Sequence, residues 1–196
     1  MITEKQSYDR IVAAHGKGLT ALVVEMCEVH FRHFPNDRFA LIWYAMAKTD
    51  LAQYAQAEKA IRRFISLWKG NGLFLGVAYK QMGTLSDARG DLRAAAVWYQ
   101  RALQTNPKLD FYAFLGHVAF NRGLLNQAEA YYRKSIKHPA SCVEEAWFNL
   151  GGVLVARRRY REALKCYRKA LKLDPQYGIA KKRLRDTELA LQLKDS

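Results

Sequence analysis

Three side chains within one short segment could bind a metal or carry out thiol chemistry: Cys27, His30 and His33. Thiolate and imidazole groups are preferred ligands of zinc. On a helix, Cys27 and His30 are three residues apart and share a face, whereas His33 is rotated away from them. The spacing therefore favours a packed or hydrogen-bonded role for Cys27 and His30 over metal or redox chemistry.

The remaining sequence offers little to an enzyme. It contains no glycine-rich phosphate loop, no nucleophile elbow and no paired zinc-ligand motif. The three cysteines, Cys27, Cys142 and Cys166, are an odd number without metal-ligand spacing, which is typical of free thiols in a reducing compartment. We therefore predict a protein that is not an enzyme, with no catalytic residues, no metal site and no cofactor.

A repeat of about 34 residues organises the chain. Aligned glycines fall at Gly83, Gly116 and Gly151, and each series of equivalent residues steps by 33 and then by 35. The clearest copy contains Trp147, Leu150, Gly151, Ala163, Tyr167, Ala170 and Pro175. A period of this length predicts a stack of identical supersecondary units, in which each unit buries its apolar side against its neighbours.

This pattern resembles the tetratricopeptide repeat (TPR) family. The resemblance implies an all-α, right-handed α-solenoid of about five helical hairpins in a single domain, 1–196. The repeats would cover about 4–37, 38–71, 76–108, 109–143 and 144–177, and a capping helix would cover 178–196. The small residues at equivalent positions, such as Gly151 and Ala163, are expected to be buried where two helices approach closely.

Helix-capping residues support this division. Ser141 with Glu144 has the spacing of a capping box in front of the fifth repeat. Asn106-Pro107 and Asp174-Pro175 each have the composition of an N-cap followed by a proline in the first turn.

The resemblance also assigns a binding groove, because the first helix of each TPR repeat lines the concave face. The positions concerned are mainly aromatic, with amides and one histidine, which suits a peptide with apolar side chains. The residues selected in this way are Trp43, Lys80, Gln81, Phe114, His117, Asn121, Phe148 and Asn149. The alternative is that aromatics such as Trp43 pack against the first helix of the chain itself or under the loop at 70–72.

One known TPR ligand can be tested by inspection. The family members that grip the C-terminal carboxylates of heat-shock chaperones need a lysine followed four residues later by an asparagine in one first helix. Here Lys80 is followed by Thr84, and the other clamp positions hold residues such as Phe114 and Glu145. The sequence therefore argues against recognition of chaperone tails.

The chain is strongly basic, with a net charge of +14. The first 37 residues hold four basic and five acidic side chains, so the excess of positive charge lies after them. Arg157, Arg158, Arg159 and Arg161 form the densest basic group. This group is either a solvated turn or a docking surface for an acidic partner; nucleic acid is disfavoured because no aromatic–basic stacking platform is evident.

These observations predict a scaffold or adaptor that binds a protein or peptide in its concave groove. Three alternatives stay open: an assembly or secretion chaperone, a binder of nucleic acid or acidic surfaces, and a regulatory arm of an enzyme complex. The polar start of the sequence does not resemble a signal peptide, and no apolar run approaches the roughly 20 residues of a membrane span. We therefore expect a cytoplasmic protein, with the identity of its partner and its oligomeric state left open.

Overall fold

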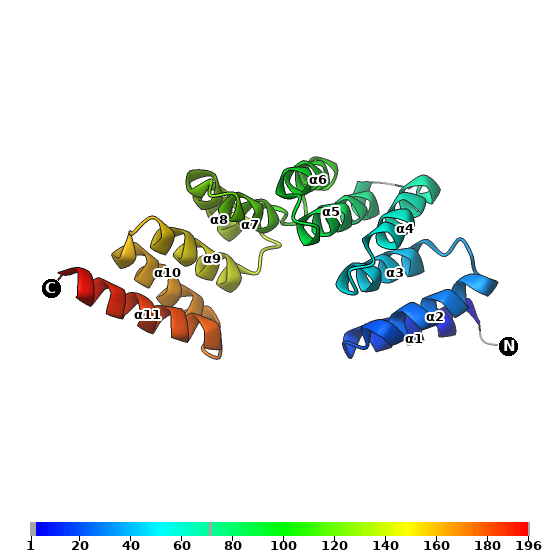
Figure 1. Cartoon of the computed structure of the whole chain (residues 1–196), viewed down its shortest axis with the longest axis horizontal. Coiled ribbons are helices and arrows are strands. Elements are labelled where there is room, and N and C mark those ends of the chain that lie inside the picture. Colours follow the sequence, from blue (N-terminus) through cyan, green and yellow to red (C-terminus); the bar gives the residue numbers. More distant parts are fainter. Residues whose placement is uncertain (1–2, 71, 196) are drawn as a thin grey trace. The chain divides into compact units, whose positions relative to one another are not determined.

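The computed structural model describes residues 3–70 and 72–195, and within them it contains eleven α-helices (Figure 1). The helices are α1 (Glu4–Gly16), α2 (Thr20–His33), α3 (Arg38–Asp50), α4 (Tyr54–Leu67), α5 (Gly72–Ala88), α6 (Leu92–Thr105), α7 (Tyr112–Asn121), α8 (Leu125–Lys137), α9 (Val143–Ala156), α10 (Tyr160–Leu173) and α11 (Gly178–Asp195).

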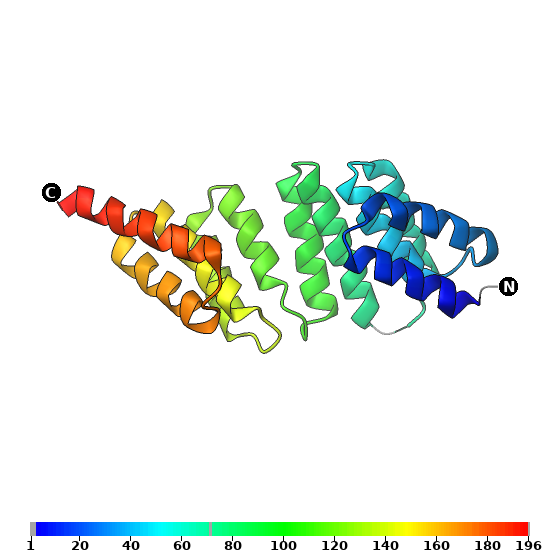
Figure 2. The same cartoon turned by 90° about the horizontal axis from the view of Figure 1, so that it is seen from below.

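Consecutive helices pair as hairpins, from α1 with α2 to α9 with α10, and α11 follows the last pair (Figure 2). The predicted all-α class of paired helical hairpins, as in a TPR-like solenoid, is therefore confirmed. The chain divides into two compact units. The first unit ends at Asn106 and contains α1 to α6, and the second begins at Pro107 and contains α7 to α11.

In three hairpins a glycine of the first helix lies directly against the ring of a tyrosine in the second helix. A Cβ atom on Gly151 would lie 2.5 Å from Cε1 of Tyr167. The same contact joins Gly83 to Tyr99 at 2.5 Å and Gly116 to Tyr132 at 2.8 Å. All three glycines are buried, as predicted, because only a residue without a side chain leaves room for the aromatic ring.

Each of the five hairpins turns through a residue with left-handed backbone conformation. Gly18, Gly90 and Gly123 have φ angles of +69°, +80° and +73°. Ala52 and Arg158 occupy the equivalent places with φ of 57° and 58°. A residue with a side chain is strained at such an angle, whereas glycine adopts it readily.

The predicted helix caps are wrong. Asn106 and Asp174 follow the last residues of α6 and α10 and are C-caps, so their prolines lie in connecting turns. The N-cap of α9 is Cys142, which makes no side-chain capping bond. A capping box does occur elsewhere, where Thr3 and Gln6 each bond the other's backbone N–H at the start of α1.

Helix α11 contacts α10, as expected for a capping helix. Its buried residues are Ala180 and Thr187, and Leu184 packs against the core of the second unit. By contrast, Ile179 is 50% exposed and Leu189 is 56% exposed. The apolar residues of this helix are therefore divided between a packed face and a solvent-facing side.

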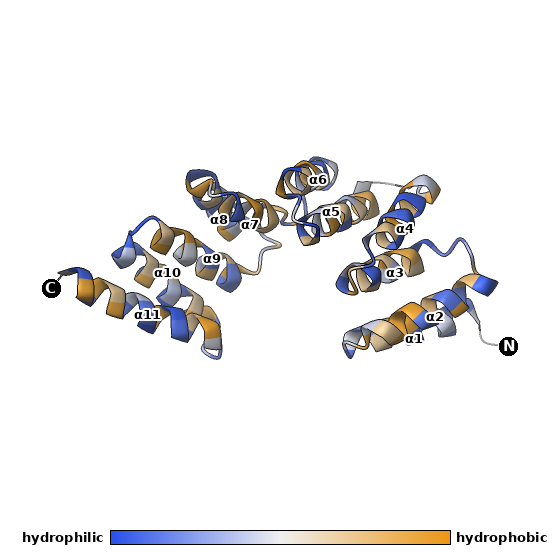
Figure 3. Cartoon of the chain, in the orientation of Figure 1, coloured by the Kyte–Doolittle hydropathy of each residue, from blue (hydrophilic) through white to orange (hydrophobic). Residues whose placement is uncertain are grey.

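Helix α2 is rich in apolar residues, and its middle turns are orange in Figure 3; some of these residues are exposed. Leu22 and Val29 are 40% and 53% exposed. The opposite side of α2, with Val23 and Cys27, is buried in the core that the first hairpin shares with α3.

Candidate functional site

Four of the eight predicted groove residues line one cavity of about 460 Å³ in the second unit: His117, Asn121, Phe148 and Asn149. The cavity lies along α7, α9 and α11, and we call it the α7–α9–α11 groove. The helices supply these side chains at intervals of three and four residues, which keeps them on one face.

Aromatic rings form much of the groove surface. Phe120 is 36% exposed, whereas Phe148 is half-buried and packs 5.8 Å from Tyr167 and 5.1 Å from Tyr177, measured between ring centroids. Tyr132 and Tyr167 border the groove from the second helices behind it and are almost completely buried. The groove therefore offers flat apolar surfaces that are held in place by packing.

Polar groups lie between these rings. The side-chain nitrogen of Asn121 lies 3.1 Å from Nε2 of His117, one helical turn away. Helix α11 adds two charged side chains, Arg183 and Asp186, to the same cavity. These two residues were not predicted, because the tail was interpreted only as a cap. Their places in α11 correspond to groove positions of the preceding repeats.

Gly152 leaves the middle of the groove open. A Cβ atom at this position would meet nothing within 4 Å, although Gly151 beside it is tightly packed. The pair of glycines therefore separates two roles: Gly151 admits the ring of Tyr167, and Gly152 keeps space in the groove.

The other four predicted groove residues do not line this cavity. Phe114 is half-buried in α7, and Gln81 is buried in the first unit with 7% exposure, which leaves its amide little access to a ligand. Lys80 is half-buried, and burial lowers the pKa of its ammonium group. Trp43 packs on its own chain, since Nε1 donates to the hydroxyl of Tyr8 at 2.9 Å.

The aromatic residues of the first unit thus follow the alternative of self-packing. The ring of Trp43 lies 4.5 Å from that of His15 in the first helix. Phe39 packs 5.1 Å from Phe74 and 6.4 Å from Trp68, on either side of the connection between α4 and α5.

Cys27 and His30 have structural contacts, in agreement with the favoured interpretation. His30 is 1% exposed, and its two ring nitrogens lie 2.9 Å from the hydroxyl of Ser7 and 2.9 Å from a carboxylate oxygen of Asp37. Cys27 donates to the carbonyl of Ala40 at 3.8 Å, and burial raises the pKa of its thiol to about 12. A thiol in this state is a poor nucleophile and a poor metal ligand at neutral pH.

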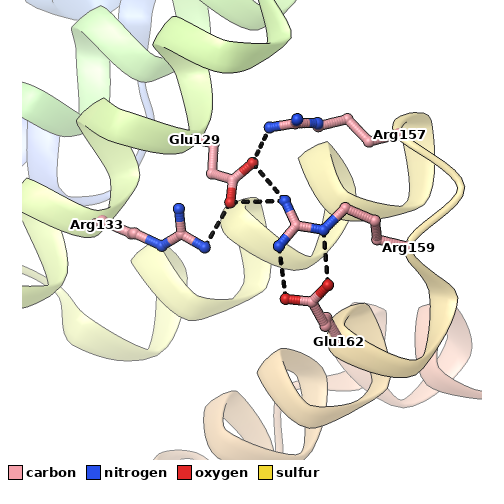
Figure 4. A network of polar contacts seen from close by, with 5 residues as sticks. All are labelled: Glu129, Arg133, Arg157, Arg159 and Glu162. Atoms are coloured by element: carbon pink, nitrogen blue, oxygen red, sulfur yellow. Dashed lines mark hydrogen bonds and ion pairs between the residues drawn. The ribbon is translucent and has the colours of Figure 1, made fainter.

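The predicted basic surface is partly neutralised. Arg157 and Arg159 both bind Glu129, a carboxylate that is 4% exposed and also contacts Arg133 at 2.5 Å (Figure 4). Arg159 additionally pairs with Glu162 at 2.6 Å. Two of the four predicted arginines therefore hold the turn between α9 and α10 against α8.

Arg158 lies in this turn, and Arg161 lies in the first turn of α10. They border a hollow of about 240 Å³, which is also lined by Arg159, Tyr160, Glu162, Leu191 and Lys194. The hollow therefore combines basic side chains with the carboxylate of Glu162.

Among the described residues, no three His, Cys, Asp or Glu side chains are close enough together to hold a metal ion. None of the helices in that part of the chain is long and apolar enough to cross a bilayer.

Comparisons with known families give a consistent result. Residues 144–177 and residues 109–137 match two models described as Tetratricopeptide repeat. Neither model belongs to a catalytic family. No curated protein matches the sequence.

Solved structures of similar fold are also TPR proteins. TTC0263, a TPR protein of Thermus thermophilus, is 21% identical, with a TM-score of 0.71 over 95% of this chain and 100% of that one. A TPR protein from Parabacteroides merdae is 16% identical, with a TM-score of 0.77 over 95% and 71% of the two chains. YrrB, a TPR protein with an unusual peptide-binding site, is 15% identical, with a TM-score of 0.60 over 89% and 88%. At these identities the likeness establishes the fold alone.

Proposed function

This chain is a tetratricopeptide repeat protein, and from that premise we propose that it is a non-enzymatic scaffold or adaptor that binds a peptide segment in the α7–α9–α11 groove. TPR domains are modules of protein–protein interaction. The observation that carries the peptide assignment is the groove itself, with Phe120 and Phe148 beside the amides of Asn121 and Asn149. Buried aromatic anchors with a few polar groups are typical of peptide-binding surfaces.

Two further observations support this assignment. The similar protein YrrB is described as having a peptide-binding site. The basic surface is the weaker candidate, because Arg157 and Arg159 are already paired with Glu129.

Gly152 provides a clean test, because a side chain there enters the groove without touching the core. Gly152→Leu should fill the cavity, and Gly152→Ala is the matched control that changes the helix in the same way with far less bulk. Peptides selected on the wild-type protein from a random-peptide display library would be titrated by calorimetry against all three proteins.

We expect Gly152→Leu to weaken binding by about tenfold or more, since a blocked groove loses contacts worth at least about 1.4 kcal/mol. Gly152→Ala should bind within about threefold of wild type. Equal binding by Gly152→Leu and wild type would move the contact surface elsewhere, and the Arg158 hollow would then be the next surface to examine.

A further inference from the structure

Three tyrosines occupy the same place in successive hairpins, but their hydroxyl groups differ. The hydroxyl of Tyr99 lies 3.3 Å from Oγ1 of Thr84, which in turn donates to the carbonyl of Lys80. Burial raises the pKa of Tyr167, and the side chain of Thr187 lies near enough to its hydroxyl to lower that pKa in part. Tyr132 has no hydrogen bond to any residue that the structure describes.

The sequence explains this difference. Thr84 directly follows the glycine beneath Tyr99, and the residue in that place beneath Tyr132 is His117, which pairs with Asn121 instead. Thr187 belongs to the helix after Tyr167, and the equivalent residue after Tyr132 is Val153, which has no polar atom to offer. Both places that supply a hydroxyl to the other tyrosines are therefore unsuitable here.

Tyr132 also borders the α7–α9–α11 groove. Its side chain is 3% exposed, and the end of its ring lies over Gly116, where a Cβ atom would be 2.9 Å from Cζ. A tyrosine hydroxyl is protonated at neutral pH and can donate, and burial raises the pKa of Tyr132 further. The hydroxyl is not one of the fully buried polar atoms that lack a partner, so it is open to the groove. A donor in this position can exchange water for an acceptor supplied by a ligand.

We infer that Tyr132 is a binding residue of the groove, whose hydroxyl donates a hydrogen bond to an acceptor oxygen of the bound peptide. This inference rests on the proposed function and identifies the chemistry of its ligand. The peptide presents an oxygen at the groove floor, between side chains that pack on Phe120 and Phe148. Asn149 and Arg183 border the same cavity and can donate to the same segment.

The acceptor oxygen has two sources, a main-chain carbonyl and a side-chain carboxylate. A neutral carbonyl makes a hydrogen bond whose loss costs about 2- to 10-fold in affinity, whereas the loss of a charge-assisted bond to a carboxylate costs more than about tenfold. Arg183 favours the carboxylate, and Asp186 beside it favours the neutral carbonyl.

The test uses Tyr132→Phe, which removes only the hydroxyl, and Tyr99→Phe as the matched control in the first unit. The probe is a peptide selected on the wild-type protein from the display library, titrated against the full-length wild type and both variants. Analogues of this peptide, with each acidic residue replaced by its amide, identify the source of the oxygen. Thermal unfolding of the free proteins is measured alongside.

We expect Tyr132→Phe to bind the peptide at least about twofold more weakly while unfolding at the same temperature as wild type or a higher one. Tyr99→Phe should bind normally and unfold at a lower temperature, because it loses a hydroxyl that is bonded to Thr84. If an amide analogue weakens binding to wild type but not to Tyr132→Phe, the acceptor is a carboxylate; if none does, it is a main-chain carbonyl.

Normal binding by Tyr132→Phe to a peptide that Gly152→Leu rejects would overturn this inference and leave the groove assignment intact. Lower stability of free Tyr132→Phe, equal to that of Tyr99→Phe, would also overturn it, because the hydroxyl would then have a partner within the protein. A peptide that binds Gly152→Leu as well as wild type would instead overturn the proposed function.

Discussion

The adjacent glycines of α9 allow the packing of one hairpin to be measured separately from helix propensity. Gly151→Ala places a methyl group 2.5 to 2.9 Å from three ring atoms of Tyr167, which is 1% exposed and cannot move aside freely. Gly152→Ala places the same methyl group in open space. Replacing glycine by alanine within a helix stabilises by about 0.5–1 kcal/mol, and both variants share this gain.

The difference between the two variants therefore isolates the overpacking term, which is about 1–3 kcal/mol. Gly152→Ala should be more stable than wild type, and Gly151→Ala should be less stable than Gly152→Ala by this amount. The assay is urea denaturation followed by circular dichroism, with hydrogen exchange of the α9 and α10 amides to locate the effect in this hairpin. Equal stability of the two variants would refute the packing of Tyr167 on Gly151.

Four other outcomes follow from the structure. Ala52→Gly should raise the unfolding free energy by about 0.5–1 kcal/mol in denaturation measurements, because it relieves a left-handed φ of 57°; a loss of stability would contradict this. Glu129→Gln should cost about 2 kcal/mol or more, because three arginines lose a buried partner, whereas Glu162→Gln, whose carboxylate is 51% exposed, should cost under about 1 kcal/mol; similar losses in urea denaturation would contradict the role of burial. Removal of 178–196 should expose the side of α10 that α11 covers and speed hydrogen exchange there, and unchanged exchange would show that α11 is no cap. In native protein a thiol reagent should modify Cys142 alone, as counted by mass spectrometry, since the other two cysteines are buried; fast modification of all three would contradict their packing.

The hairpins could be predicted from the sequence because their main packing contact repeats. Gly151 and Tyr167 are 16 residues apart in the same repeat, and the same pair recurs at Gly83 and Tyr99. A steric requirement that recurs at a fixed period is visible in one sequence without any homologue. The burial of these glycines followed directly from that period.

Contacts that occur once could not be predicted in this way. Arg159 lies 30 residues from Glu129 and has no basic equivalent in the other hairpins, so the arginine group was interpreted as a surface. Glu129 itself has an equivalent in Glu58, which pairs with Arg62 and Arg89. The helix caps were predicted wrongly for a different reason. An Asn-Pro or Asp-Pro pair is compatible with the end of one helix as well as with the start of the next. The choice depends on the length of the connecting turn, which propensity does not determine.

Some residues of the groove could be predicted from the repeat, and others could not. Phe148 and Asn149 could be selected because they lie in the clearest repeat, and they line the cavity together with His117 and Asn121. Arg183 was missed because α11 has lost the repeat pattern, with an arginine at 185 where the preceding repeats have glycine. Arg183 still lies at a groove position, because a helix keeps its periodicity even where the packing residues have changed.

The contact between glycine and tyrosine links the fold to the function of the groove. In each of these hairpins the tyrosine ring lies across a glycine of the first helix, and Tyr132 and Tyr167 reach the groove in this way. The residue after the glycine then decides what the ring end meets: Thr84 binds the hydroxyl of Tyr99, whereas His117 bonds Asn121 and no residue in the described ranges, 3–70 and 72–195, accepts from Tyr132. Because the packing depends on the glycine and the tyrosine, this neighbouring position can change the chemistry of the groove without disturbing the hairpin.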